Sequence, residues 1–426
     1  MTLIAARVVN IATGLATIPL TFHYLGKEQF GLWMTLTSFI SFLSFSDFGL
    51  GEGLQNVLIQ CYGKSDYETP RTYVSAAATL MGGICLLFIG LAIFVFPLLP
   101  WNDLIPLEEE VARAQLLPTA QAMFIGCGLG LAAALVQRVS DGYQRGYIGW
   151  AFMLLGRTMG FIGVVLSIFL GFPLWVLAGV YVATPHVILM LGGLSLLFKA
   201  PWLIPSPTRS SVAAFQTILR VGGASTVIRA GYTLMHSAPA LIIANQLGAA
   251  LVGPLSVTQK LVGTVGIITA SAMSPLRNSY GEAAIRGDWA WIERTMRRLL
   301  RLITLVYLPT ILVLAAFGRE IILLWTGDAA LQPSVSLLVA YGTYFTLHAY
   351  TAAFSGMLYS LNRLRCQAMY YSFWAAIAAG FGYVFAHELG VAGIIWCVAL
   401  CEIGLCAFTA FDVHFVLRRR LITAHG

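Results

Sequence analysis

The chain has 426 residues and a formal net charge of +7, and although 58% of its residues are hydrophobic only 10% are charged. A soluble domain carries about 25% charged residues, so this composition excludes a water-soluble protein and predicts an all-α polytopic membrane protein. A transmembrane β-barrel is also excluded, because its strands alternate apolar and polar residues, whereas the apolar runs here are continuous over helix lengths.

The apolar runs predict twelve transmembrane helices, each near or above the roughly 20 residues that a bilayer core requires. The first lacks a basic n-region and is longer than a signal-peptide core, so we interpret it as a spanning helix and not as a cleaved signal. The predicted spans are 2–23, 30–58, 72–98, 117–139, 148–170, 174–198, 213–246, 253–276, 295–317, 334–361, 367–387 and 391–416.

The middle of the chain predicts a boundary between two halves. The stretch KAPWLIPSPTRSS, at 199–211, contains three prolines, and such a composition is typical of a stiff linker. We therefore expect an N-terminal six-helix lobe at 1–198, a cytoplasmic linker at 199–211 and a C-terminal six-helix lobe at 212–426.

A repeated connector indicates that the two halves arose by duplication. LGKEQFGLW begins at Leu25 and LGAALVGPL at Leu247, and a later pair, LGFPL at Leu170 and LGVAG at Leu389, has nearly the same separation. Coincidence among glycine-rich apolar helices is the alternative. Because six is an even number of spans, duplicated halves enter the membrane with the same polarity and are related by an axis along its normal.

Basic residues assign the orientation through the positive-inside rule. The odd-numbered connectors contain only Lys27, Arg113 and Arg319. The even-numbered connectors and the C-terminal tail contain many more basic residues, which predicts that both termini are cytoplasmic. These basic residues are Lys64, Arg71, Arg145, Lys199, Arg209, Arg277, Arg286, Arg294, Arg363, Arg365, Arg418, Arg419 and Arg420.

Two stretches resemble a known transporter family. YLGKEQFGLWMTLTSFISFLSFSDFGLGEGLQN is similar to the start of polysaccharide and O-antigen flippases of the multidrug/oligosaccharidyl-lipid/polysaccharide (MOP) exporter superfamily. IANQLGAALVGPLSVTQKL resembles the turn after the seventh helix of the same proteins. The likeness is specific over 7–66 and 215–261.

This resemblance implies a fold and a function. The fold is a MATE-like bundle of two six-helix lobes. The function is translocation of an undecaprenyl-diphosphate-linked oligosaccharide to the outer leaflet of the bacterial inner membrane, for O-antigen and lipopolysaccharide biosynthesis. The implied partners are this lipid-linked substrate, membrane lipids, and a polysaccharide polymerase or assembly proteins. We expect no nucleic-acid partner and no cofactor.

Four basic residues inside predicted spans are candidates for binding the substrate. Arg7 and Arg229 are equivalent in the duplication and lie at similar depth, and a guanidinium group matches phosphate oxygens. Lys260 lies on helix 8, and Arg157 lies near the middle of helix 5. The alternatives are that they snorkel to an interface, pair with an acid or, for Arg157, form a structural hydrogen-bond hub.

Three acidic residues are candidates for ion coupling or charge pairing. Asp47 and Glu52 lie in SDFGLGEGLQN, where pairing with Arg7 is the default interpretation, and the alternatives are binding of a proton or Na⁺ and contact with sugar hydroxyls. Glu402 in helix 12 is a further candidate. Like His348 and His236, it is more typical of a polar contact between helices than of a coupling site. No His partners the seven cysteines at metal-binding spacing, so we expect no metal site.

Two rival functions differ from the flippase in their sequence requirements. A cation-coupled multidrug exporter of the same fold usually has an acid in helix 1, whereas 2–23 contains Arg7 and no carboxylate. A membrane-embedded transferase needs an acid–base or metal constellation in a sizeable loop. The only long loop, at 97–116, contains no His or Cys, so we expect that the protein is not an enzyme.

Overall fold

A computed structural model of the protein describes residues 2–43, 49–63, 69–143, 145–361 and 363–425. All the elements in these residues are helical. The principal helices are α1 (Thr2–Leu43), α2 (Leu50–Gly63), α3 (Thr69–Gly90), α5 (Glu110–Gly142), α6 (Gly146–Phe169), α7 (Leu174–Lys199), α8 (Val212–Gln246), α9 (Val252–Ile285), α10 (Trp289–Thr326), α11 (Val335–Ser360), α12 (Leu364–Val384) and α13 (Ala386–His425). The shorter ones are the π-helix η1 (Leu91–Val95), α4 (Trp101–Leu104) and the 3₁₀ helices η2 (Phe96–Leu98), η3 (Pro201–Leu203), η4 (Pro207–Arg209), η5 (Ala249–Leu251) and η6 (Ala329–Leu331).

Each predicted span overlaps helix in this structure, and the all-α polytopic fold is confirmed. Seven of the helices in the described residues are long and apolar enough to cross a membrane by themselves. The second span differs in detail from the expectation of one helix at 30–58. It is made of the second part of α1 and of α2, and Gly49, with φ of 75°, precedes α2.

The glycines of the repeated connectors have positive φ values, a backbone conformation that favours glycine. Gly26 and Gly248 have φ of 75° and 103°, and Gly171 and Gly390 have φ of 70° and 62°. This left-handed region is open to glycine at little cost and is unfavourable for residues with a Cβ. Both members of each aligned pair therefore make the same kind of sharp turn between helices, in agreement with duplication.

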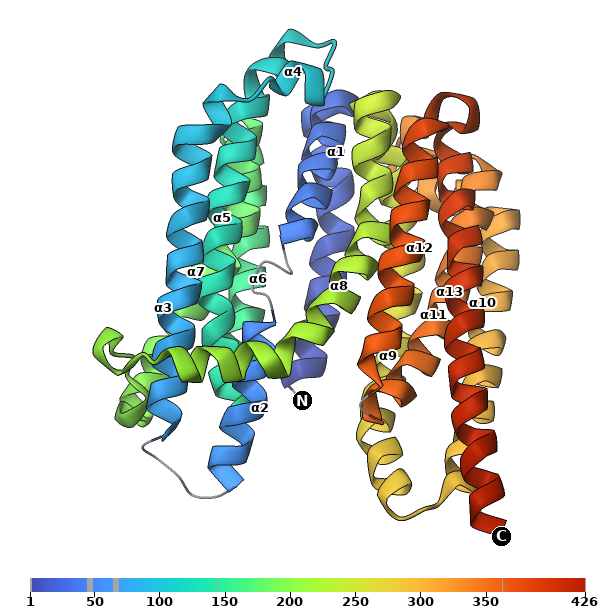
Figure 1. The fold of residues 1–426 in the computed structure, drawn as a ribbon. Coiled ribbons are helices and arrows are strands. Elements are labelled where there is room, and N and C mark those ends of the chain that lie inside the picture. Colours follow the sequence, from blue (N-terminus) through green and yellow to red (C-terminus); the bar gives the residue numbers. More distant parts are fainter. Residues whose placement is uncertain (1, 44–48, 64–68, 144, 362, 426) are drawn as a thin grey trace. The chain divides into compact units, whose positions relative to one another are not determined.

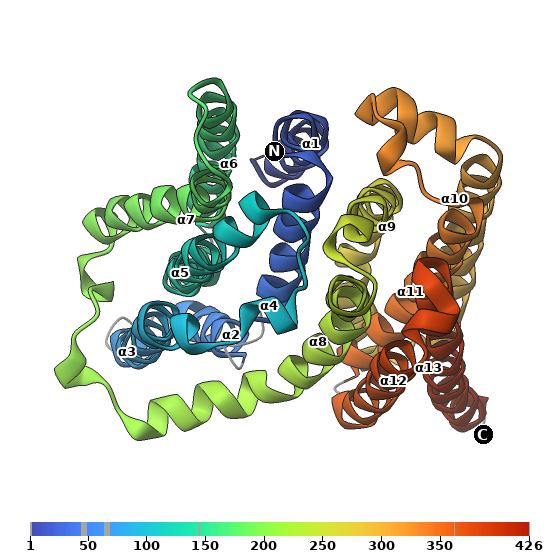
Figure 2. The same ribbon diagram turned by 90° about the horizontal axis from the view of Figure 1, so that it is seen from above.

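The described residues form two compact units. One contains residues 1–226 and 248–250, and the other contains 227–247 and 251–426. In the first unit α5 is the central helix and packs against α1, α2, α3, α6 and α7 (Figures 1 and 2). In the second unit α11 is central and packs against α9, α10, α12 and α13. The two central helices are the fourth and tenth spans, which are equivalent positions in the two halves.

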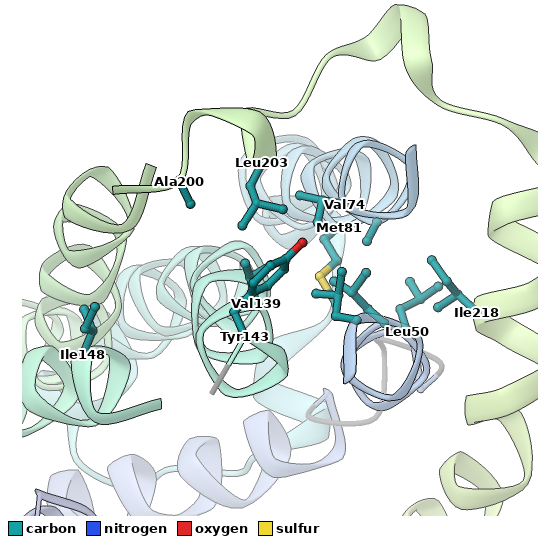
Figure 3. Close-up of a cluster of buried hydrophobic side chains, with 12 residues drawn as sticks. Leu50, Val74, Met81, Val139, Tyr143, Ile148, Ala200, Leu203 and Ile218 are labelled. Atoms are coloured by element: carbon teal, nitrogen blue, oxygen red, sulfur yellow. The ribbon is translucent and has the colours of Figure 1, made fainter. Parts of the chain in front are cut away.

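The boundary between the two compact units falls inside α8, between Thr226 and Val227. The first turns of α8 pack on the first unit because Ile218 is fully buried in a cluster with Leu50, Leu54 and Leu58 of α2 (Figure 3). The carbonyl of Ile218 approaches Gly53 so closely that a Cβ there would collide with it. Residues 212–226 therefore belong to the first compact unit.

The proline-rich linker also packs on the first unit. Leu203 is fully buried in the same cluster as Val74 and Met81 of α3 (Figure 3). The Nε of Arg71 donates a hydrogen bond to the carbonyl of Ile204 at 3.0 Å. The linker is thus held to α3 by apolar contacts and by polar contacts to its backbone.

A buried carboxylate holds the connector that precedes α5. Glu28, just after the Gly26 turn of α1, accepts hydrogen bonds from the backbone N–H groups of Glu108 and Glu109, at 2.5 and 2.7 Å. These donors lie at the start of α5, where free N–H groups favour a negative charge. One side chain therefore joins the first interhelical turn to the 97–116 loop.

Candidate functional site

The pattern Tyr-x-x-x-His occurs on two helices of the second unit. It reads YTLMH at Tyr232–His236 on α8 and YFTLH at Tyr344–His348 on α11. Residues four apart lie on the same face of an α-helix, so each helix presents a tyrosine above a histidine. We call these four residues the Tyr–His cluster.

The rings of the Tyr–His cluster pack against one another. Tyr232 stacks on His236 with ring centroids 5.4 Å apart, and it stacks on His348 of the other helix at 4.7 Å. Tyr344 lies 6.4 Å from His236 and 6.1 Å from His348. Such ring contacts add roughly 0.5–1.5 kcal/mol each beyond the area they bury. The stacking therefore holds both imidazoles in defined orientations.

A cavity of about 250 Å³ lies beside the cluster within the second unit. Tyr232 and His348 line it, together with Thr269 of α9 and Tyr307 of α10, whose hydroxyls share a hydrogen bond of 3.1 Å. The rest of its lining is apolar or glycine and includes Gly263, Gly266, Met273, Phe345, Ala349 and Ala352. This mixture of a few polar groups in an apolar wall is typical of a small binding site.

His236 is held in its neutral form by an amide. The side-chain Nε2 of Gln259 donates to the Nε2 of His236 at 2.9 Å and to the backbone carbonyl of the same residue at 3.1 Å. An amide nitrogen donates and does not accept, so the Nε2 of His236 is an acceptor and carries no proton. The imidazole of His236 is therefore uncharged in this arrangement.

His348 has a carboxylate partner instead. Its Nδ1 lies 3.3 Å from the Oε1 of Glu402 on α13. The Glu402 side chain is 1% exposed and that of His348 is 20% exposed, and His348, unlike Glu402, is part of the cavity lining. This contact is buried and joins two helices, whereas the pairs Glu282–Arg286 and Glu293–Arg297 are formed by residues four apart near the surface.

The basic candidates of the second unit lie on the two helices that line this region. Arg229 is half-buried on α8, one turn before Tyr232, and Lys260 is half-buried on α9, next to Gln259. Both make polar or electrostatic contacts within the protein. Substrate binding by either residue stays a prediction.

The candidates near the N-terminus are less completely described. The side chain of Arg7 and the whole of Asp47 lie outside the described residues. Glu52 is half-buried in the first turn of α2 and also has an interaction partner. The expected pairing of these acids with Arg7 therefore stays a prediction.

Arg157 lies in a polar group inside the first unit. Gly156 allows α6 to approach Pro185 of α7, where a Cβ would lie 2.7 Å from the proline Cα. This close packing places Arg157 in electrostatic contact with Tyr181 and His186 of α7. The contacts are those of a hub between two helices, and a direct role of Arg157 in substrate binding stays a prediction.

Most of the cavity lining was not predicted from the sequence. His236, His348 and Glu402 were predicted to make contacts between helices, and neither Tyr232 nor Gln259 was among the candidates. The repeated Tyr-x-x-x-His pattern was the signal that could have linked these residues. In the described part of the chain, no three His, Cys, Asp or Glu side chains are arranged to hold a metal ion.

Sequence relatives extend along almost the whole chain, although no protein-family model matches it. A protein named "Putative O-antigen transporter" from Salmonella typhimurium is 20% identical over 395 residues, which cover 92% of this chain and 89% of the relative. A protein of the same name from Salmonella typhi is 19% identical and covers 97% of this chain and 94% of the relative.

Solved structures give the same fold. An inward-facing multidrug resistance MATE family transporter of the MOP superfamily superposes with a TM-score of 0.75 at 15% identity, covering 98% of this chain and 96% of that one. A MOP superfamily transporter from Pyrococcus furiosus, for which reverse polarity of the binding pocket suggests a different function, gives 0.71 at 14% identity, with 98% and 95% covered.

These similar proteins are transporters and not enzymes, in agreement with the expectation that the chain catalyses no reaction. At 14–15% identity, the match to these solved structures establishes the fold alone. The superposition extends over both compact units. The chain is thus a multi-pass membrane protein with the MATE-like fold of the MOP superfamily, and its resemblance to the O-antigen flippases of that superfamily is confirmed.

Proposed function

We propose that the protein is a flippase that moves an undecaprenyl-diphosphate-linked oligosaccharide across the bacterial inner membrane by alternating access, with both termini in the cytoplasm. The observation that carries this proposal is the likeness, over more than nine-tenths of the chain, to two proteins named as O-antigen transporters. The polymerase or assembly proteins of a polysaccharide pathway would then receive the product.

The chemistry of the spans supports an anionic substrate. A diphosphate needs cationic hydrogen-bond donors that stay charged inside the membrane, and guanidinium groups meet this requirement. Arg229 is half-buried on α8, and Lys260 is half-buried on α9 of the same unit. Arg7 is the equivalent of Arg229 on the first helix. We propose that these three residues bind the diphosphate and that Arg157 supports them.

A multidrug exporter is the alternative function, because solved multidrug MATE transporters share the fold. A drug exporter that takes up cationic compounds gains from acidic groups in its first helix, but residues 2–23 contain no Asp or Glu. The arginine in this helix would repel a cationic drug and attract a phosphate. The balance of charge therefore favours the lipid-linked substrate.

Complementation distinguishes the two functions. In a strain whose own O-antigen flippase is deleted, expression of the protein is expected to restore surface glycan and to remove lipid-linked oligosaccharide that accumulates in the inner leaflet. Drug susceptibility of an exporter-deficient strain is measured in parallel and is expected not to change. Restored drug resistance without glycan at normal protein abundance would instead assign the protein to drug export.

The orientation predicts which exposed positions react with an impermeant maleimide in intact cells. Cysteine at Glu109, in the connector before α5, is expected to be labelled, whereas cysteine at Ser210, in the linker, is expected to react only after permeabilisation. Both positions are exposed, and Cys366, the exposed native cysteine, is replaced by serine beforehand. Labelling of Ser210→Cys in intact cells would reverse the topology.

A further inference from the structure

We propose that His348 and Glu402 form a proton-binding site, and that the transport cycle takes up and releases one proton there. The part of the proposal that concerns transport rests on the proposed flippase function. The binding of the proton does not rest on that function, because it follows from the geometry of the second unit alone.

The position of the pair favours the binding of a proton. Glu402 is almost completely buried on α13, which packs along α11, and it contacts His348, whose side chain lines the cavity. A charge in this environment is costly unless it is paired or neutralised. A proton that enters from the cavity meets His348 first. The Nδ1–H of His348 can then pass it to the Oε1 of Glu402, 3.3 Å away.

The two arrangements of one proton on the pair differ little in free energy. With the proton on His348 the pair is a buried ion pair, and with the proton on Glu402 it is a neutral hydrogen bond. The cost of desolvating two charges largely offsets their attraction in a buried pair. Both arrangements have zero net charge, whereas loss of the proton leaves one negative charge inside the unit.

Several titratable groups around the pair are neutral. The titratable groups in electrostatic contact with the pair include Tyr232, His236, Tyr344, Tyr371, Cys401 and Cys406. Tyrosine and cysteine are ordinarily neutral near pH 7, and the amide of Gln259 holds His236 neutral. The charge of the pair and these six neighbours taken together therefore changes only with the proton on the pair.

The cations of the same region connect the proton to the substrate. Arg229 precedes Tyr232 by one helical turn, and Lys260 is adjacent to Gln259. Loss of the proton adds a negative charge to the unit that contains these two cations. A diphosphate bound by them would be repelled by that charge and would therefore favour the protonated pair. By linkage, protonation would favour diphosphate binding to the same extent.

Infrared spectroscopy of the purified full-length protein in lipid nanodiscs tests proton binding without any substrate. Spectra are compared between about pH 5 and about pH 8, the range in which histidine normally titrates. A protonated-carboxyl band that changes over this range is expected in the wild type and lost in Glu402→Gln. Gln keeps the shape and the hydrogen-bond acceptor, so a merely structural contact would survive.

Two further variants test the assignment of the infrared band to Glu402. Glu282→Gln removes an exposed carboxylate that is paired with Arg286 at the C-terminal end of α9, and it is expected to keep the band. His348→Gln keeps a side-chain donor but cannot titrate, and it is expected to shift the pH at which the band changes. If Glu402→Gln does not fold, this shift still decides the question. An unchanged band in both Glu402→Gln and His348→Gln would overturn the proton site.

Glycan display at different external pH values tests coupling. The wild type is expected to show pH-dependent display in the flippase-deleted strain, and Glu402→Gln is expected to lose that dependence. Equal pH dependence in both would overturn the coupling role. If spectroscopy assigns the band to Glu402 but the wild type never restores display, the flippase function fails and the proton site stands.

Discussion

Replacing Arg229 with alanine is expected to reduce glycan display at least about tenfold while the protein still reaches the membrane at normal abundance. If the guanidinium binds the diphosphate, its removal eliminates a charge-assisted hydrogen-bond pair, a loss of about 1.5–3 kcal/mol. Every 1.4 kcal/mol is about tenfold in binding. The measurement is surface glycan in a flippase-deleted strain, with the amount of protein in the membrane determined alongside.

Matched variants separate substrate binding from a general effect of charge. Arg229→Lys is expected to restore only part of the display, because lysine keeps the charge but lacks the planar pair of donors. Arg220→Ala removes an exposed arginine from the same helix and is expected to leave display near the wild-type level. Equal losses in Arg220→Ala and Arg229→Ala would contradict a specific site at Arg229.

The duplication adds a test of symmetry. The double variant Arg7→Ala/Arg229→Ala is expected to be nearly inactive, because both equivalent helices then lack their cation. Alternatively, Arg7 serves only to neutralise Asp47 or Glu52. In that case neutralising the acid should rescue Arg7→Ala but not Arg229→Ala. Full display by the double variant would exclude these two arginines from diphosphate binding and leave Lys260 and Arg157.

Replacing Gly53 with valine is expected to detach the first turns of α8 from the first unit. The Cβ of any residue at this position would lie 2.9 Å from the carbonyl carbon and from the Cγ2 of Ile218. Inserting atoms into such a packed contact costs about 1–3 kcal/mol. A change of this size raises the detached fraction between about fivefold and about a hundredfold.

Cysteine labelling measures this detachment. Ala214 is 4% exposed at the start of α8, so a cysteine at this position reacts with a maleimide only when the helix leaves the first unit. The labelling rate is compared in Gly53→Val and in Gly83→Val, since Gly83 is exposed and has no atom within 4 Å of its added Cβ. Equal rates in both would show that the contact between Gly53 and Ile218 does not hold α8.

Local properties of the sequence determined the helices and their connectors. Continuous apolar runs of bilayer length predict spans because backbone groups inside a membrane must bond within their own helix. The connectors at Gly26 and Gly248 were readable because only glycine enters the left-handed region at little cost. Duplication then related the two halves, and the central positions of α5 and α11 agree with it.

The tertiary structure determines which part of α8 packs with each unit. From the sequence, 212–226 was simply the start of the seventh span, after a proline-rich linker. The burial of Ile218 among leucines of α2 assigns this segment to the first unit. Hydropathy identifies Ile218 as apolar but does not identify the surface against which it packs, because many helices of a membrane protein have apolar surfaces.

The pairing of His348 with Glu402 also depends on the tertiary structure. The two residues are on different helices, and either one alone is typical of a polar contact between spans. Their approach depends on the packing of α11 along α13, and the orientation of His348 depends on stacking against Tyr232 of α8. Helical periodicity is a local property of the chain, whereas the rotation of one helix against another is set by the side chains of both. The sequence therefore determined that both groups lie inside the membrane, and helix packing determined that they meet.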